Sequence, residues 1–262
     1  MKTTFGIRHV AVIAAFLATL VMNFLSQGAA SFNLTLFPRT VAELGELYPI
    51  YFLPAGYVFA IWGAIYLGLG AFVVYHNGMG RVNPLMRRVG WLFVVTCLAN
   101  MAWLILFLNE QFALSTLAML TLLGALIAIY QIQEIGLRTV TPTVRWMTHV
   151  PFSIYLGWIT VATVANVTYV LFDAQWDGFG ISGELWAALM MAVAAFITAL
   201  MIARRRDVAY ALVVIWALIG IIVRYPNVTV VALAAAIAAG LIAVLIALQS
   251  LQRRTPRASL QA

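Results

Sequence analysis

The sequence predicts an all-α integral membrane protein with eight transmembrane helices and with both termini in the cytoplasm. Two observations lead to this fold class. The first is composition: of 262 residues, 65% are hydrophobic and 9% are charged, and the mean hydropathy is +1.01. Soluble domains carry about 25% charged residues, so the chain belongs in a bilayer. The second is the distribution of basic residues, which alternates between successive loops.

Eight apolar stretches are long enough to cross a bilayer, which takes roughly 17–25 residues. Turn-forming pairs separate them, such as Asn77-Gly78 and Asn83-Pro84, as helix boundaries require. The seventh stretch is the shortest. In chain order the predicted spans are 9–29, 55–76, 89–108, 112–132, 150–172, 183–203, 208–224 and 229–249.

The charged residues support this count. With the N-terminus inside, 13 of the 15 Lys and Arg residues fall in inner segments, and only Arg39 and Arg224 fall outside. This is the asymmetry that the positive-inside rule describes. The basic residues are spread over several inner segments, which favours anionic lipid headgroups as partners and argues against nucleic acid. Short loops without sorting signals favour a bacterial plasma membrane.

The first span has an alternative interpretation as a cleavable signal peptide, with Gly28-Ala29-Ala30 as the cleavage region. A signal-peptide core runs about 7–15 residues, whereas this stretch extends further and carries Asn23, Ser26 and Gln27. We therefore expect a retained helix, although cleavage would leave the remaining orientation unchanged. The single cysteine, Cys97, is expected to be a buried core residue in the third span.

Several functional classes lack the residues that they need. The predicted membrane cores contain no Asp, Glu, Lys or Arg, which argues against a proton-coupled pump or a voltage-gated channel. Three scattered histidines and one cysteine do not suggest a metal site. The chain has no P-loop, G-x-S-x-G or H-E-x-x-H motif. We predict no catalytic residue, no metal ligand and no required cofactor.

Aromatic and amide side chains form stripes at helical spacing on several spans, and residues so spaced share one helix face. Because an amide is costly to expose to lipid, these faces should point into the bundle. There they either form interhelical hydrogen bonds or line a small-molecule pocket. The stripes are Phe59, Trp62 and Tyr66; Asn100, Trp103 and Phe107; and Tyr155, Trp158, Ala162, Asn166 and Tyr169.

The same residues carry a family resemblance. The stretch PAGYVFAIWGAIY at 54–66 resembles the second-helix signature of the translocator protein family, also called the tryptophan-rich sensory proteins or TspO/MBR. The N-x-x-W-x-x-x-F pattern at 100–107 is similar to the third-helix motif of that family. The W-x-x-x-A-T-x-x-N pattern at 158–166 is similar to its fifth-helix motif. Three motifs in the expected order make the match fairly specific.

The resemblance covers about residues 9–173. It implies a five-helix bundle in which the long loop 30–54 folds over a pocket. We therefore divide the chain into a TspO-like bundle, 1–173, and a three-helix membrane extension with a short basic tail, 174–262. In the extension, Ala232, Ala236 and Gly240 are four residues apart, a spacing that allows close packing against the bundle or a second copy of the chain.

Members of this family bind porphyrins, haem-like tetrapyrroles and, in animals, cholesterol and drug-like ligands. The resemblance, together with the stripes, implies a ligand site formed by Tyr57, Phe59, Trp62, Tyr66, Asn100, Trp103, Phe107, Tyr155, Trp158, Thr163 and Asn166. This chain also departs from the family pattern. Pro-Ala-Gly-Tyr at 54–57 replaces the usual Pro-Pro-Gly-Trp, and Tyr48, Tyr51 and Phe52 occupy the loop where some members have tryptophan.

The resemblance implies a ligand-binding membrane protein that senses, sequesters or carries a tetrapyrrole or another flat apolar molecule. A secondary transporter of a small apolar or amphipathic molecule is the alternative. An enzyme that degrades bound porphyrin, and a structural subunit without a ligand, are further hypotheses. The expected partners are membrane lipids, the small-molecule ligand and a second copy of the chain.

Overall fold

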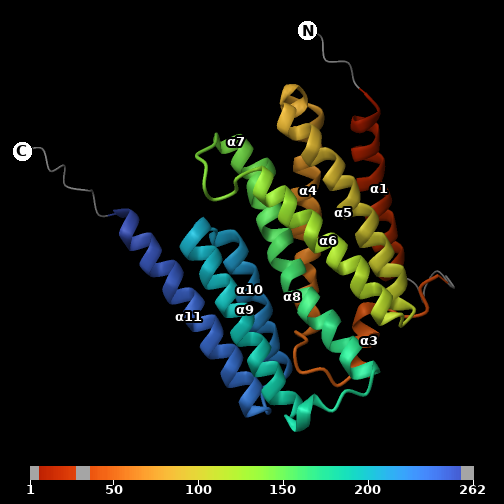
Figure 1. The fold of residues 1–262 in the computed structure, drawn as a ribbon, viewed down its shortest axis with the longest axis vertical. Helices are drawn as coiled ribbons and strands as arrows, with labels where there is room; N and C mark the ends of the chain where they lie inside the picture. Colours follow the sequence, from red (N-terminus) through yellow and green to blue (C-terminus); the bar gives the residue numbers. More distant parts are fainter. Residues whose placement is uncertain (1–5, 28–35, 255–262) are drawn as a thin grey trace, which may run out of the picture.

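The computed structural model describes residues 6–27 and 36–254, and every regular element within these ranges is a helix (Figure 1). Residues 28–30, the cleavage region of the alternative signal-peptide interpretation, lie outside the described residues. In chain order the helices are α1 (Ile7–Gln27), α3 (Val41–Leu47), η1 (Gly56–Ala60), α4 (Ile61–Asn77), η2 (Met79–Val82), α5 (Pro84–Leu108), α6 (Phe112–Ile132), α7 (Pro142–Val144), η3 (Arg145–His149), α8 (Val150–Asp173), η4 (Gly178–Gly180), α9 (Gly183–Arg205), α10 (Val208–Arg224) and α11 (Thr229–Arg254).

The helices confirm an integral, multi-pass membrane protein. Seven of the described helical segments are long and apolar enough to cross a bilayer. The helix at the seventh predicted span, α10, is apolar but shorter. Its 17 residues reach about 25 Å at 1.5 Å per residue. The crossing count of eight and the cytoplasmic orientation stay predictions. Figure 1 shows that α1 begins and α11 ends at the same end of the bundle.

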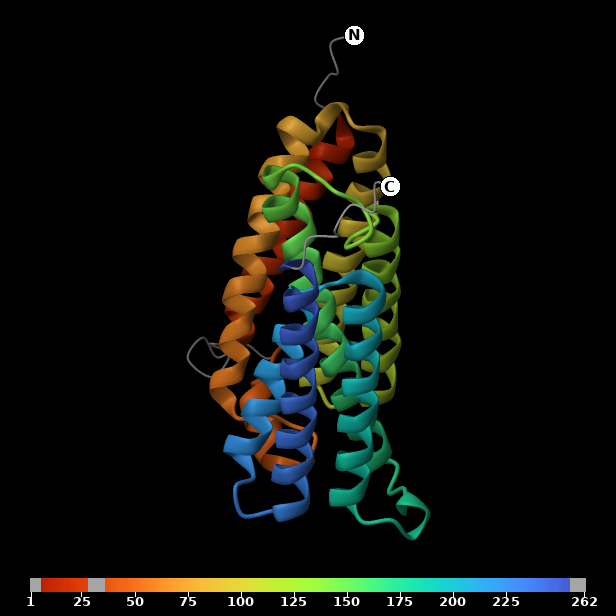
Figure 2. The ribbon, with the colours of Figure 1, turned by 90° about the vertical axis from the view of Figure 1, so that its left-hand side faces the viewer.

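The helices form two groups that pack side by side. In the first group α5 packs against α1 and α6, α6 packs against α8, and α4 packs against α1 and α8. In the second group α10 and α9 both pack against α11. The main contact between the groups is α10 on α8, so the second group covers one side of the first (Figures 1 and 2). Among the described helices of the second group, α10 therefore makes the most extensive contact with the first group.

Local sequence explains where the helices begin. The Asn83 side chain accepts a hydrogen bond from the Leu85 amide at the start of α5, and Pro84 occupies the first turn. Asp207 caps α10 by accepting from the Tyr210 amide. Side-chain caps of this kind satisfy amides that the first helical turn leaves unpaired.

Two irregular turns set the approach of α4 to α8. The α4 helix is preceded by the 3₁₀ turn η1, and α8 is preceded by the π-helical turn η3 with Pro151 just beyond it. Gly68 of α4 lies so close to this region that a Cβ atom there would meet the Pro151 Cβ at 3.0 Å. The two helices can approach this closely because Gly68 carries no side chain where it faces Pro151.

The buried position of Cys97 agrees with the sequence prediction. The small-residue stripe of α11 does not pack within the chain. Ala235 and Ala238 face the bundle instead, whereas Ala236 and Gly240 are exposed, and a Cβ atom on Gly240 would meet nothing within 4 Å. The structure therefore contradicts one of the two open alternatives, packing of that stripe against the bundle, and its contact with a second copy stays a prediction.

Candidate ligand-binding site

A cavity of about 120 Å³ lies inside the first helix group. It is mainly apolar and is closed at one side by the segment between α1 and α4. We call it the central cavity. Its walls come from α1 (Asn23, Gln27), the segment before α4 (Val41, Leu53, Pro54, Gly56, Phe59), α4 (Trp62), α5 (Trp103, Leu104, Phe107), α6 (Met119) and α8 (Trp158, Val161, Ala162, Ala165, Asn166, Tyr169).

Three aromatic rings meet at the wall between α4 and α8. The Phe59 and Trp158 rings pack edge to face with centroids 5.6 Å apart, and the Trp62 and Trp158 rings do so at 6.3 Å. Tyr66 stacks on Trp62 at 5.3 Å from behind, and Tyr155 contacts the same indole at 6.0 Å. Edge-to-face and offset stacking are the favourable arrangements of aromatic pairs. The wall is therefore an ordered aromatic surface supported by a second layer of tyrosines.

A hydrogen-bond network fixes the part of the wall where α5, α6 and α8 meet. The Trp103 indole Nε1 donates to Asn166 Oδ1 at 2.7 Å. The Asn166 amide donates to Thr116 Oγ1 at 2.6 Å and to Ser115 Oγ at 3.1 Å, which links α5, α6 and α8. Because the Asn166 side chain already has these partners, its part in the site is to hold the Trp103 ring in place.

A second amide pair joins α1 to α5. Asn23 Nδ2 donates to Asn100 Oδ1 at 3.0 Å, and Asn100 is fully buried. The Asn100 Nδ2 atom and the Tyr169 hydroxyl are buried polar groups without a partner among the described residues. Buried polar groups are normally paired, so both are available to a bound molecule. The Tyr66 hydroxyl, beside Trp62, is likewise buried without a partner among the described residues.

The structure brings together six of the residues predicted for the site. Phe59, Trp62, Trp103, Phe107, Trp158 and Asn166 line the central cavity. The other five lie elsewhere. Tyr66 and Tyr155 contact the Trp62 ring, and Asn100 pairs with Asn23. Tyr57 packs against Trp216 and is 46% exposed. Thr163 lines a different cavity.

The predicted set omitted several wall residues. Tyr169 belongs to the same α8 stripe as Trp158 and Asn166, so its spacing was a usable signal. The polar face of α1 likewise indicated Asn23. Pro54 opens the motif at 54–66 that carries the family resemblance, which was also a usable signal. Met119 and Leu53 carried none, because their position depends on how α6 and the preceding loop pack.

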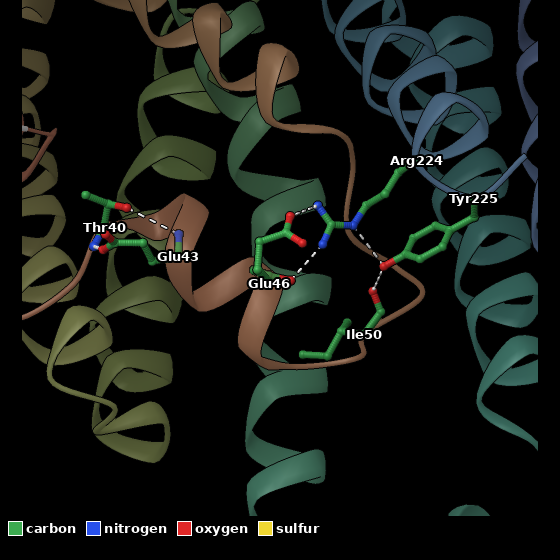
Figure 3. A network of polar contacts seen from close by, with 7 residues as sticks. Thr40, Glu43, Glu46, Ile50, Arg224 and Tyr225 are labelled. Carbon is green, nitrogen blue, oxygen red and sulfur yellow. Dashed lines mark hydrogen bonds and ion pairs between the residues drawn. The ribbon is translucent and has the colours of Figure 1, made fainter.

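Residues 36–60 form the cover of the central cavity, and we call them the lid segment. The α3 helix within it is stabilised by a capping box, in which Thr40 and Glu43 each bond the other's backbone amide (Figure 3). Leu53, Pro54 and Gly56 then pass over the cavity and lead into η1. The predicted long loop over a pocket is therefore present, and it contains a short helix that hydropathy did not reveal.

The lid segment is held from one side by the turn between α5 and α6. Arg39 forms an ion pair with Glu110, and the Tyr48 hydroxyl donates to the same carboxylate at 2.8 Å. Burial, together with this hydrogen bond, raises the pKa of Tyr48 to about 12, so the hydroxyl stays protonated and donates at neutral pH. Asn109 Nδ2 also donates to the Leu36 carbonyl at 3.0 Å.

The lid segment is held from the other side by α10 and the residue after it. Arg224 donates to the Gly45 carbonyl at 2.7 Å and lies 3.2 Å from Glu46, while the Tyr225 hydroxyl donates to the Ile50 carbonyl at 2.7 Å (Figure 3). Further along α10, the Gly220 carbonyl accepts from the Ala55 amide at 3.0 Å. The second helix group therefore fixes the cover of a cavity that lies in the first.

A larger cavity of about 620 Å³ lies on the other side of α8, between α8, α9 and the lid segment. We call it the lateral cavity. Its aromatic wall residues include Tyr51, Phe52, Trp176 and Trp186. Residues 49–52 line the lateral cavity and residues 53–54 line the central one, so the lid segment separates the two. Among the described residues, no three His, Cys, Asp or Glu side chains are grouped to hold a metal ion.

A family model described as "TSPO-like protein" matches residues 9–248. The match extends beyond residue 173 and includes α9, α10 and most of α11. Comparison with curated proteins and with solved structures gave no match. The matched range takes in both helix groups and the lid segment, and the chain therefore belongs to the TSPO-like protein family.

Proposed function

We propose that this protein binds a flat, mainly apolar small molecule of the tetrapyrrole class in the central cavity, and that it senses, sequesters or carries that molecule. The observation that carries the proposal is the convergence of Phe59, Trp62 and Trp158 at one wall. Aromatic walls with a few placed polar groups are the usual composition of small-molecule sites. Indole and phenyl rings also stack well on flat ligands.

The size of the cavity indicates how binding would proceed. Small-molecule pockets usually enclose about 300–1,000 Å³, whereas the central cavity encloses about 120 Å³. A tetrapyrrole therefore requires enlargement, and we assign this to the lid segment. Its Leu53, Pro54 and Gly56 line the cavity, and polar contacts hold the segment from two sides, through the turn between α5 and α6 and through α10. The structure then corresponds to the closed arrangement of the lid segment.

The polar groups of the cavity divide into two roles. Asn166 and Trp103 bond to each other and to α6, so they keep the wall in place. Tyr169 lines the cavity, and its buried hydroxyl has no partner among the described residues. It would donate a hydrogen bond to a carboxylate or carbonyl at the edge of an otherwise apolar ligand, and so set its orientation.

The experiment is a titration of the detergent-purified protein with protoporphyrin IX, followed by quenching of tryptophan fluorescence. We expect saturable quenching at micromolar concentration, and at least about tenfold weaker binding in Trp62→Ala and Trp158→Ala, as for buried aromatic anchors of binding sites. Trp91→Ala is the matched control, because Trp91 is 44% exposed and lines neither cavity. Linear quenching that none of these variants changes would mean partition into the micelle and would reject the proposal.

A flux assay separates binding from transport. Both cavities lie toward the end of the bundle that carries α3 and the turn between α5 and α6, so neither forms a route across the bilayer. We therefore expect protoporphyrin IX to bind saturably in proteoliposomes without protein-dependent accumulation in the lumen. Saturable accumulation that Trp158→Ala abolishes would favour the transporter alternative.

A further inference from the structure

A third pocket lies at the opposite end of the bundle from the lid segment, and the proposed ligand site does not involve it. It encloses about 310 Å³. Three stretches far apart in the sequence build it: the turn after α6 at 135–140, the start of α8 with the preceding η3, and the connection from α9 to α10 at 205–209. We call it the basic pocket.

The charges around the basic pocket are mostly positive. Arg138, Arg145, Arg205 and Arg206 line it, together with a single carboxylate, Asp207. That carboxylate is already engaged, since one oxygen accepts from the Tyr210 amide at 3.1 Å and the other from the Tyr130 hydroxyl at 2.7 Å. Within the described ranges no ion pair joins Asp207 to an arginine. Arg138 lies 3.8 Å from Glu134, so the uncompensated positive charge comes from Arg145, Arg205 and Arg206.

The backbone holds the two arginine-bearing turns together. Gly136 has φ +81°, and a Cβ atom there would lie 1.8 Å from the Arg205 carbonyl oxygen, so only glycine permits the contact. Arg205 in turn donates to the Ile135 carbonyl at 3.4 Å and lies over the Tyr130 ring at 5.5 Å from its centroid. Arg206 ends α9 in the left-handed conformation at φ 54°. These contacts position the walls independently of any ligand.

Two buried polar side chains complete the wall. His149 is 7% exposed and Ser153 is 2% exposed, and both line the pocket. No hydrogen bond involves either side chain within residues 6–27 and 36–254. Because buried polar groups are normally paired, these two are donors that a bound anion would satisfy.

We propose that the basic pocket binds a phosphate-bearing anion, either the headgroup phosphate of an anionic lipid or free phosphate. Arginine forms short, bidentate, charge-assisted hydrogen bonds with phosphate oxygens. Basic pockets between transmembrane helices on the cytoplasmic side are typical binding sites for anionic headgroups. The predicted orientation places the basic pocket on that side. Arg145 and Arg206 are exposed at its mouth, and Ser153 is buried in its wall.

The test uses the full chain in neutral detergent, with bound lipid counted by native mass spectrometry. We expect one phosphatidylglycerol per chain, bound saturably and in preference to phosphatidylcholine. Each arginine near a membrane surface is worth about fivefold in such binding. The double variant Arg145→Gln/Arg206→Asn should therefore lose at least about tenfold. Asparagine is chosen at 206 because it tolerates the left-handed conformation.

Arg204→Gln is the control, because Arg204 is an exposed neighbour that does not line the pocket. Unchanged protoporphyrin IX binding shows that each variant is folded. If millimolar inorganic phosphate competes with phosphatidylglycerol, the pocket binds the lipid through its headgroup phosphate. If phosphate alone binds and the double variant abolishes it, free phosphate is the ligand. Equal retention of both lipids with no phosphate binding, or equal losses in Arg204→Gln, would overturn the proposal.

Discussion

The Trp216 indole on α10 donates to the Val58 backbone carbonyl at 3.0 Å. These residues are far apart in the chain and belong to different helix groups. The same indole packs edge to face against Tyr57 at 5.4 Å. Val58 lies in η1, the turn that carries the lid segment into α4. The second helix group thus contacts the lid segment that covers the central cavity and helps to hold it in position.

Removing this hydrogen bond should loosen the lid segment. Trp216→Phe keeps a ring against Tyr57 but cannot donate to Val58. A hydrogen bond of this kind contributes about 1 kcal/mol net, which corresponds to roughly fivefold in an opening equilibrium. We therefore expect protoporphyrin IX to associate about fivefold faster in stopped-flow measurements. Trp91→Phe, which also removes one indole, should leave the rate unchanged, and equal rates in all three proteins would contradict control of the lid by α10.

A glycine of α10 offers a second test of the same contact. A Cβ atom on Gly220 would lie 2.2 Å from Val58 Cγ2 and 2.9 Å from Pro54 Cβ. Gly220→Ala should therefore displace the lid segment at a cost of about 1–3 kcal/mol, the usual range for overpacking. Thermal unfolding in detergent measures this as a lower midpoint.

Gly240→Ala in α11 is the matched control, since nothing lies within 4 Å of that position. Because alanine favours a helix over glycine, the control should keep or slightly raise the midpoint. A similar loss in both variants would mean that the Gly220 contact is not specific.

The network around Asn166 should matter for stability. Asn166→Ala leaves the Trp103 indole N–H without its acceptor and removes the links to Ser115 and Thr116, whose hydroxyls keep their bonds to the Phe112 carbonyl. Unpaired buried polar groups cost about 1–3 kcal/mol each, so we expect a clear fall in the unfolding midpoint. Asn77→Ala is the comparison, because the Asn77 amide donates to the Val73 carbonyl of its own helix. Equal midpoints for the two variants would argue against a network spanning three helices.

Tyr169→Phe should affect the ligand and leave the fold intact. The hydroxyl has no partner among the described residues, so its loss removes no internal hydrogen bond. We expect an unchanged unfolding midpoint and roughly three- to tenfold weaker binding of protoporphyrin IX, which carries carboxylates. A flat hydrocarbon ligand without polar groups should bind both proteins equally. If the variant weakened both ligands alike, Tyr169 would act through packing only.

Hydropathy and charge predicted the long helices because each span must be apolar along its whole length in lipid. The same reasoning could not reveal α3 or the π-helical turn before Pro151, since capping by Thr40 and a local change of pitch leave no hydropathy signal. It also misplaced the packing face of α11, where Ala, Leu and Ile occur all round the helix and periodicity does not distinguish Ala235 from Ala236.

The site was predictable where helical spacing alone places a side chain. Trp62, Trp158 and Asn166 share faces that must point inward, and they line the cavity. Tyr66 and Tyr155 lie on nearly the same helix faces, but they contact the Trp62 ring and do not line the cavity. Helical spacing could not predict this, because the crossing of α4 and α8 decides which ring reaches the cavity. The anchoring of the lid segment by Arg224 and Tyr225 depends on tertiary contacts that no local pattern carries.

The central claim is that the ligand occupies the aromatic cavity between α4, α5 and α8 rather than the larger cavity beside α9. Comparing protoporphyrin IX affinity in Trp158→Ala and Trp186→Ala tests it most directly, because each indole lines one cavity. We predict that Trp158→Ala weakens binding by at least about tenfold, whereas Trp186→Ala changes it less than about twofold. The reverse order, with loss only in Trp186→Ala, would place the ligand in the lateral cavity and contradict the account.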